Sequence, residues 1–186
     1  MKNCQKTFQF TLILSNADEH TSGLEDKLYE TGCDDALINF RNGTVYLDFD
    51  RIASSLKEAV ISAIRQIESS SLGAVVAGVA PDNFVTESEV AERLSMKRQA
   101  VSLWIKGQRR ASTPFPNPKL KLSNKSPLWK WNEVAAWLYT NHVIMCKEIV
   151  DDAIFIEDIN AALEERNAKT REHRQELVER LSTHLK

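Results

Sequence analysis

The sequence has few of the residues from which catalytic and metal sites are usually built. Its three cysteines, Cys4, Cys33 and Cys146, stand far apart, and none belongs to a Cys-x-x-Cys pair. The four histidines are scattered, and histidine and cysteine residues are not grouped into the two ligand pairs of a common zinc site. This distribution argues against a disulfide framework and against a zinc site. We expect a protein of the reducing cytoplasm that holds no metal.

Other common functional patterns are also missing. Only six glycines occur, and none are grouped as in a phosphate-binding loop. The adjacent carboxylates of Asp34-Asp35 and Asp151-Asp152 should point apart, so we expect solvated surface at both pairs. The apolar run from Phe8 to Leu14 is interrupted and too short to span a membrane. We therefore expect no enzyme, no cofactor and no membrane partner.

What the sequence does have is an uneven distribution of charge. The chain carries 24 basic and 26 acidic residues, yet every ionised side chain between Lys97 and Trp131 is a cation. A local excess of this kind favours a polyanionic partner, because lysine and arginine that neutralise phosphates release condensed counterions. Taken alone, such a run could also be a solvated face. The nine cations are Lys97, Arg98, Lys106, Arg109, Arg110, Lys119, Lys121, Lys125 and Lys130.

Residues 1–80 alternate between strand and helix patterns. Period-two apolar residues predict a strand over 8–14, and Asn42-Gly43 predicts a tight hairpin between strands at 36–40 and 44–49. Helices are expected near 24–29 and after a cap at Ser54 or Ser55, and a last strand over 72–79. The order βαββαβ predicts an α+β fold of the ferredoxin-like type.

The charge of this first region bears on its partners. Residues 1–80 contain seven basic and eleven acidic side chains, a balance that repels phosphate. An RNA-recognition module is therefore disfavoured, although the fold type includes such modules. We expect a protein partner, a sensing role or dimerisation through this domain, and the sequence does not choose among them.

A helix-turn-helix pattern opens the basic region, after a domain boundary at Pro81-Asp82-Asn83. Thr86 and Glu89 have the spacing of a capping box, which predicts a helix from about Glu87. Apolar residues at Val101 and Trp104 then indicate a second helix after a short turn. The side chains left on its outer face are the candidates for reading base edges in the major groove: Arg98, Gln99, Ser102 and Lys106. Helical units of this kind also serve as protein adaptors.

Two alternating segments downstream predict a wing. Lys119–Leu122 and Leu128–Trp131 are expected to pair as two strands with lysines outward, and Asn132 to cap the helix that follows. Trp104 and Trp137 are expected in the core rather than as stacking platforms. Wings lay cations along the phosphate backbone or minor groove. The expected phosphate contacts are Lys97, Arg109, Arg110, Lys119, Lys121, Lys125 and Lys130.

These motifs carry a resemblance to a known family. The run VTESEVAERLSMKRQAVSLWIKGQRR, followed by FPNP and SPLWKWNEVAAWL, resembles the winged helix-turn-helix of the excisionase and AlpA group, which is distantly MerR-like. The match covers about Phe84 to Leu138, and it implies a bacterial or phage DNA-binding regulator. The chain has Ser95 where that family often has glycine, and Lys97 where it has a capping serine or threonine.

Residues 141–186 are expected to form a helical tail. Ile149, Ala153, Ile156, Asn160 and Leu163 follow heptad-like spacings, which favours a helix pair between two chains and hence a homodimer. The alternative is that the tail folds back onto residues 1–80 and the protein is monomeric.

Together these patterns predict a sequence-specific double-stranded DNA-binding protein, most simply a transcriptional regulator that acts by occupying an operator. Its predicted domains are an α+β domain at 1–80, a winged helix-turn-helix at 84–140 and the tail at 141–186. Two alternatives stay open. One is an interaction module such as an antitoxin-like neutraliser, and the other is a recombination accessory protein that bends DNA.

Overall fold

The computed structural model describes residues 5–81, 83–109, 111–122, 126–166 and 168–182. The chain divides into two compact units: residues 1–81 with 158–186, and residues 82–157. The expected tail is thus divided between the units, because its helix α6 (Glu148–Glu165) begins in the second unit and ends in the first. Among the described residues, no helix is long and apolar enough to cross a membrane.

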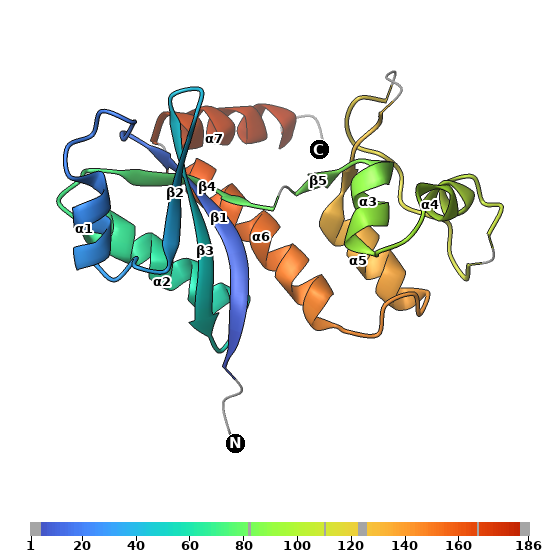
Figure 1. Cartoon of the computed structure of the whole chain (residues 1–186). Coiled ribbons are helices and arrows are strands. Elements are labelled where there is room, and N and C mark those ends of the chain that lie inside the picture. The colour runs from blue at the N-terminus through green and yellow to red at the C-terminus, as the bar shows by residue number, and fades with distance from the viewer. Residues whose placement is uncertain (1–4, 82, 110, 123–125, 167, 183–186) are drawn as a thin grey trace. The chain divides into compact units, whose positions relative to one another are not determined.

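The first unit is built on a four-stranded antiparallel sheet (Figure 1). Its strands are β1 (Lys6–Ser15), β2 (Ala36–Arg41), β3 (Thr44–Ala53) and β4 (Val75–Ala80), arranged in the order β2-β3-β1-β4. The helices α1 (Leu24–Glu30) and α2 (Leu56–Ser69) complete the predicted order βαββαβ. The mixed α+β class expected from the sequence is therefore confirmed.

Alternation along the strands produces the core of this unit. Phe8, Phe10, Leu12 and Leu14 are all buried, and they share one face of β1. Phe10 stacks on Phe49 of β3 with ring centroids 5.0 Å apart. Of the two residues predicted as possible caps of α2, Ser55 is the one that caps it. Its side chain accepts a hydrogen bond from the Glu58 amide (3.2 Å).

The hairpin between β2 and β3 forms where the sequence predicts it. Asn42 and Gly43 have φ values of 53° and 75°, the pair of positive φ angles that a two-residue type I′ turn requires. Arg41 and Thr44 are paired directly across the turn. The turn therefore fixes the register of β2 against β3, which decides which backbone groups of β2 remain free.

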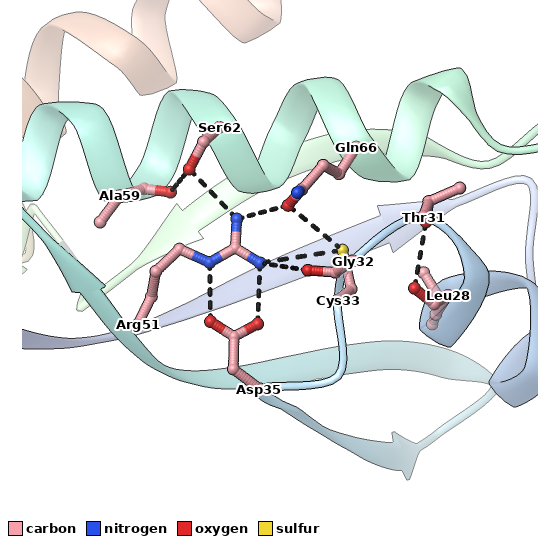
Figure 2. Close-up of polar contacts among 9 residues, drawn as sticks. All are labelled: Leu28, Thr31, Gly32, Cys33, Asp35, Arg51, Ala59, Ser62 and Gln66. Atoms are coloured by element: carbon pink, nitrogen blue, oxygen red, sulfur yellow. Dashed lines mark hydrogen bonds and ion pairs between the residues drawn. The ribbon is translucent and has the colours of Figure 1, made fainter.

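A buried guanidinium ties the first unit together (Figure 2). Arg51 is 7% exposed and makes a bidentate ion pair with Asp35, in which Nε donates to Oδ2 (2.8 Å) and Nη2 donates to Oδ1 (2.7 Å). Its other N–H groups donate to Gln66 Oε1 (2.6 Å), Ser62 Oγ (3.1 Å) and the Gly32 carbonyl (3.2 Å). The expectation of solvated surface at Asp34-Asp35 was wrong for Asp35, because its partner lies 16 residues away on another strand.

The second unit contains three helices and part of a fourth among its described residues. These are α3 (Glu87–Arg93), α4 (Arg98–Ile105), α5 (Trp131–Thr140) and the first part of α6. Two short strands, β5 (Phe84–Val85) and β6 (Trp129–Lys130), pair antiparallel. The final helix α7 (Ala168–Ser182) belongs to the first unit.

The apolar stripe of the predicted tail is mostly buried within the single chain. Ala153, Ile156 and Leu163 are each less than 10% exposed, whereas Ile149 is 39% exposed. Asn160, the polar residue of the stripe, bonds both backbone groups of Val79 on β4, each at 2.8 Å. The stripe therefore has partners without a second chain, which removes the reason for expecting a helix pair along it.

Candidate nucleic-acid interface

The helix-turn-helix begins with a complete capping box. Thr86 Oγ1 accepts a hydrogen bond from the Glu89 amide, and the Glu89 carboxylate accepts one from the Thr86 amide (2.6 Å). The Thr86 amide, as the largest cause, holds the pKa of Glu89 below its usual value. The predicted start of this helix at Glu87 is thus confirmed.

The turn between the two helices depends on Ser95. Its φ is +50°, in the left-handed region that glycine adopts most easily, and it is the position at which the resembling family often has glycine. The Ser95 amide donates to the Glu92 carbonyl (2.9 Å) and the Met96 amide to the Ala91 carbonyl (2.8 Å). These bonds close the end of α3 and redirect the chain into α4.

Aromatic packing holds the inner face of α4 in the core of the second unit. Trp104 is 4% exposed and meets Trp137 of α5 edge-to-face, at 5.5 Å between ring centroids. Phe115 lies against both Trp129 and Trp137. The core positions predicted for Trp104 and Trp137 are confirmed. With its inner face held in this aromatic cluster, α4 presents its remaining side to solvent.

The predicted base-reading residues lie on that outer side. Arg98, Gln99 and Lys106 are exposed, and Ser102 is half-buried. Lys97 is exposed at the N-cap of α4 and makes no side-chain cap bond, as its identity led us to expect. The exposed set has the donors and acceptors that base edges in a major groove require.

Arg98 has a partner that the sequence did not reveal. Its guanidinium lies against the carboxylate of Glu87 at the start of α3, with Nε–Oε1 at 3.4 Å and Nη2–Oε2 at 3.5 Å. The Arg98 side chain is 63% exposed, so this pair is weak and solvent-screened. Glu87 therefore holds the guanidinium near the surface of α4 without burying it.

Carboxylates from outside the basic run also reach the predicted phosphate contacts. Lys119 pairs with Glu133 (2.9 Å), and Lys130 pairs with Glu157. Arg109 instead lies over the ring of Trp104, at 4.5 Å from its centroid. Within the described part of the chain, Lys97 and Lys121 of this set have no carboxylate at ion-pairing distance, and neither does Lys106 of the base-reading set. Arg110 and Lys125, two further predicted contacts, fall outside the described residues.

The predicted wing is reduced to a single bridge. Leu120 and Leu128 pair through two backbone bonds of 3.0 and 3.3 Å, and no longer ladder joins their segments in the described residues. Lys121 has a φ of 54°, which interrupts an extended strand after one residue. The residues expected to complete the wing, at 129–130, pair instead with 84–85.

The helix after the bridge also starts differently from the prediction. It begins at Trp131, and the residue at its N-cap is Lys130, which makes no side-chain cap bond. Asn132 lies inside the first turn, where its Oδ1 accepts from the next amide (2.7 Å). The expectation that Asn132 caps this helix was therefore wrong.

Asn141 is a structural residue of this unit, although no pattern in the sequence predicts its role. Its Oδ1 accepts from both the amide and the hydroxyl of Ser112 (2.7 Å each), and its Nδ2 donates to Thr113 Oγ1 (3.1 Å). Trp137 Nε1 donates to the Thr113 carbonyl (3.0 Å). The segment after α4 is thus anchored on the end of α5.

No family model, curated protein or solved structure matches the chain. In the described residues, no group of three or more histidine, cysteine or carboxylate side chains is arranged to hold a metal ion. The helix pair α3–α4 and the exposed face of α4 are therefore the features of the molecule that bear on its function.

Proposed function

We propose that the second unit binds double-stranded DNA by placing α4 in the major groove, and that the protein regulates transcription by occupying an operator. The observation that carries this proposal is the two-sided character of α4. Its inner face is fixed by Trp104 in an aromatic cluster, while Arg98, Gln99 and Lys106 are exposed on the outer face. A rigid helix with exposed bidentate donors is what direct readout needs.

The family expectation is part of the proposal. We propose that the second unit is a reduced winged helix-turn-helix of the excisionase type, with the Leu120–Leu128 bridge in the place of the wing. For the first unit, the strand order β2-β3-β1-β4 supports the ferredoxin-like arrangement expected from its sequence.

The ion pairs divide the predicted phosphate contacts into two groups. Lys97, Arg109 and Lys121 are exposed and have no carboxylate at ion-pairing distance in the described structure. The same holds for Lys106 of the base-reading set, so these four can reach phosphates without breaking an ion pair. Lys119 and Lys130 must leave Glu133 and Glu157 before they can do so. We therefore place the main phosphate contacts at the ends of α4 and at Lys121, rather than at Lys119 and Lys130.

A homodimer remains part of the proposal, through a different surface. Since the stripe of α6 is buried in the chain, the surface that supports pairing is α7, on which Leu177, Val178 and Leu181 are 42–71% exposed. Two chains paired there would favour an operator with two half-sites. Light scattering at micromolar concentration of wild type and Leu181→Asp tests this: a monomeric wild type excludes the dimer.

One observation favours a second candidate, a protein-interaction module such as an antitoxin-like neutraliser. The carboxylates of Glu87, Glu133 and Glu157 offset part of the basic run, so its surface is less cationic than the sequence suggests. An adaptor of this kind would bind no duplex.

A salt titration of duplex binding separates the two. With labelled duplex DNA and anisotropy as the readout, about four phosphate contacts should give a slope of log K against log salt near −4. Lys106→Ala should reduce the slope by about one, whereas the matched control Lys57→Ala, on α2 of the first unit, should leave it unchanged. A slope near zero for the wild type would contradict DNA binding.

A further inference from the structure

The two edge strands of the sheet in the first unit differ in whether their outer backbone groups are hydrogen-bonded. The β4 edge is occupied by side chains of the same unit. Asn160 bonds the amide and carbonyl of Val79, and Arg166 bonds the Val76 carbonyl (3.0 Å) as well as Glu68. The β2 edge carries no further strand in the described residues. Exposed sheet edges are templates for an added strand unless they are blocked.

The hairpin register identifies the free backbone groups of β2. Residues opposite each other in an antiparallel pair alternate between bonded and non-bonded pairs, and the pair that closes a two-residue turn is bonded. Because Arg41 pairs with Thr44 across the turn, the amides and carbonyls of Ala36, Ile38 and Phe40 face away from β3. The Ala36 amide donates to the Cys33 carbonyl (3.2 Å), so the groups left unpaired among the described residues are the Ala36 carbonyl and both backbone groups of Ile38 and Phe40.

A hollow lined by both apolar and acidic side chains lies beside these unpaired groups. It has a volume of about 590 Å³ and lies between α1 and β2. Its apolar lining includes Leu24, Leu28, Tyr29, Ile38 and Phe40. Tyr29 and Phe40 are 69% and 48% exposed, so large apolar surface is available next to the free backbone groups. A strand added to β2 would place every second side chain over this hollow.

The charge of the hollow selects its occupant. The charged side chains that line it are Glu25, Asp26 and Asp34, and no lysine or arginine lines it. A second copy paired edge to edge through β2 would bring two such acidic sets together, which opposes that association. An extended segment with lysine or arginine beside its apolar residues complements both features.

We propose that β2 binds an extended, basic segment of a partner protein as a fifth strand, with apolar side chains of that segment in the hollow and its cations near Glu25, Asp26 and Asp34. The binding surface is thus the free edge of β2 and the adjacent face of α1. This inference is independent of the proposed DNA binding, since no residue of the second unit takes part in it.

A short acetylated and labelled peptide serves as the probe for the full chain. Valine and lysine take turns at every second position, with threonine between them, so that both side chains face the hollow. Anisotropy should show binding that saturates, while the same peptide with glutamate in place of lysine should bind at least about tenfold more weakly. Methylation of the backbone nitrogens of one alternate set of residues should abolish binding, whereas methylation of the other set should leave it. Equal loss from both sets would overturn the added strand.

Two protein variants locate the site. Asp34 lies on a loop at the hollow, and Asp34→Lys should weaken binding of the lysine peptide about tenfold. Glu172→Lys on α7 makes the same change of charge elsewhere in the unit and should have no effect. Equal weakening by both variants, or no binding of the probe at all, would overturn the proposal. A wild-type dimer that Phe40→Lys dissociates would assign the edge to a second copy instead.

Discussion

Two arginines, one in each unit, show how differently this chain uses the same ion pair. Arg51 in the first unit is buried, and its N–H groups donate to five oxygen atoms on four residues. Arg98 in the second unit meets a single carboxylate at 3.4–3.5 Å and keeps a 63% exposed side chain. The first is committed to the fold, and the second is available to a partner. Burial and the number of acceptors, rather than charge, separate the two roles.

The largest effect expected from this comparison is on stability. Arg51→Ala leaves the Asp35 carboxylate without its cation and should lower the free energy of unfolding by about 3 kcal/mol. Arg98→Ala, the matched substitution at the exposed pair, should change it by less than about 0.5 kcal/mol. Urea unfolding measures both. Similar losses from the two variants would remove the distinction.

For DNA binding, Arg98→Ala should have a larger effect than Arg51→Ala, the reverse of their order in stability. Arg98→Ala should cost about 1–3 kcal/mol at one base position, as expected for a lost bidentate contact. Lys97→Ala should weaken all sequences alike, because a phosphate contact carries no base information. Selection from a random duplex pool tests this. An unchanged sequence preference for Arg98→Ala would show that Arg98 reads no base.

A substitution in the turn before α4 should increase the stability of the protein. Ser95 has a φ of +50°, and glycine adopts that conformation without the clash of a Cβ atom. Ser95→Gly should therefore raise the free energy of unfolding by about 0.5–1 kcal/mol and leave sequence preference intact. Thermal unfolding of the variant at matched concentration gives the answer, and a loss of stability would contradict the strain at Ser95.

The smallest effect expected concerns pH in the first unit. Hydrogen bonds from Arg166, followed by the Val76 amide, lower the pKa of Glu68 in the folded chain below 4.5. A lowered folded pKa means that the pair stabilises above about pH 4.5 and that this contribution disappears as the pH falls through the folded pKa. Glu68→Gln should therefore cost a few tenths of a kcal/mol at pH 7 and less at pH 3. Unfolding at the two pH values tests the sign.

Local patterns predicted the elements of both units well. Three of these elements depend only on residues that are close in sequence: the capping box of Thr86 and Glu89, the turn at Asn42-Gly43 and the alternation of β1. Their stabilising interactions can therefore be recognised from the sequence alone. The burial of Trp104 and Trp137 followed from helical spacing alone. The same reasoning placed Arg98, Gln99 and Lys106 on the exposed side of α4, with Ser102 only partly accessible.

Contacts between distant residues could not be predicted in this way. Glu87, Glu133 and Glu157 lie outside the basic run, and only the fold brings them to Arg98, Lys119 and Lys130. The stripe on α6 has the spacing of a helix pair, but the sequence does not show that Asn160 meets the backbone of Val79. The pairing of the wing segments is shorter than expected among the described residues, because β6 pairs with β5, a strand upstream of the helix pair.

The most direct test of the central claim is hydrogen exchange of the full chain with and without a duplex obtained by selection. If α4 reads the major groove, amides from about Met96 to Arg109 should exchange more slowly with DNA bound, while those of β2 should not change. Protection confined to the first unit, or no protection in α4 at a saturating concentration of duplex, would contradict the assignment of DNA binding to the second unit.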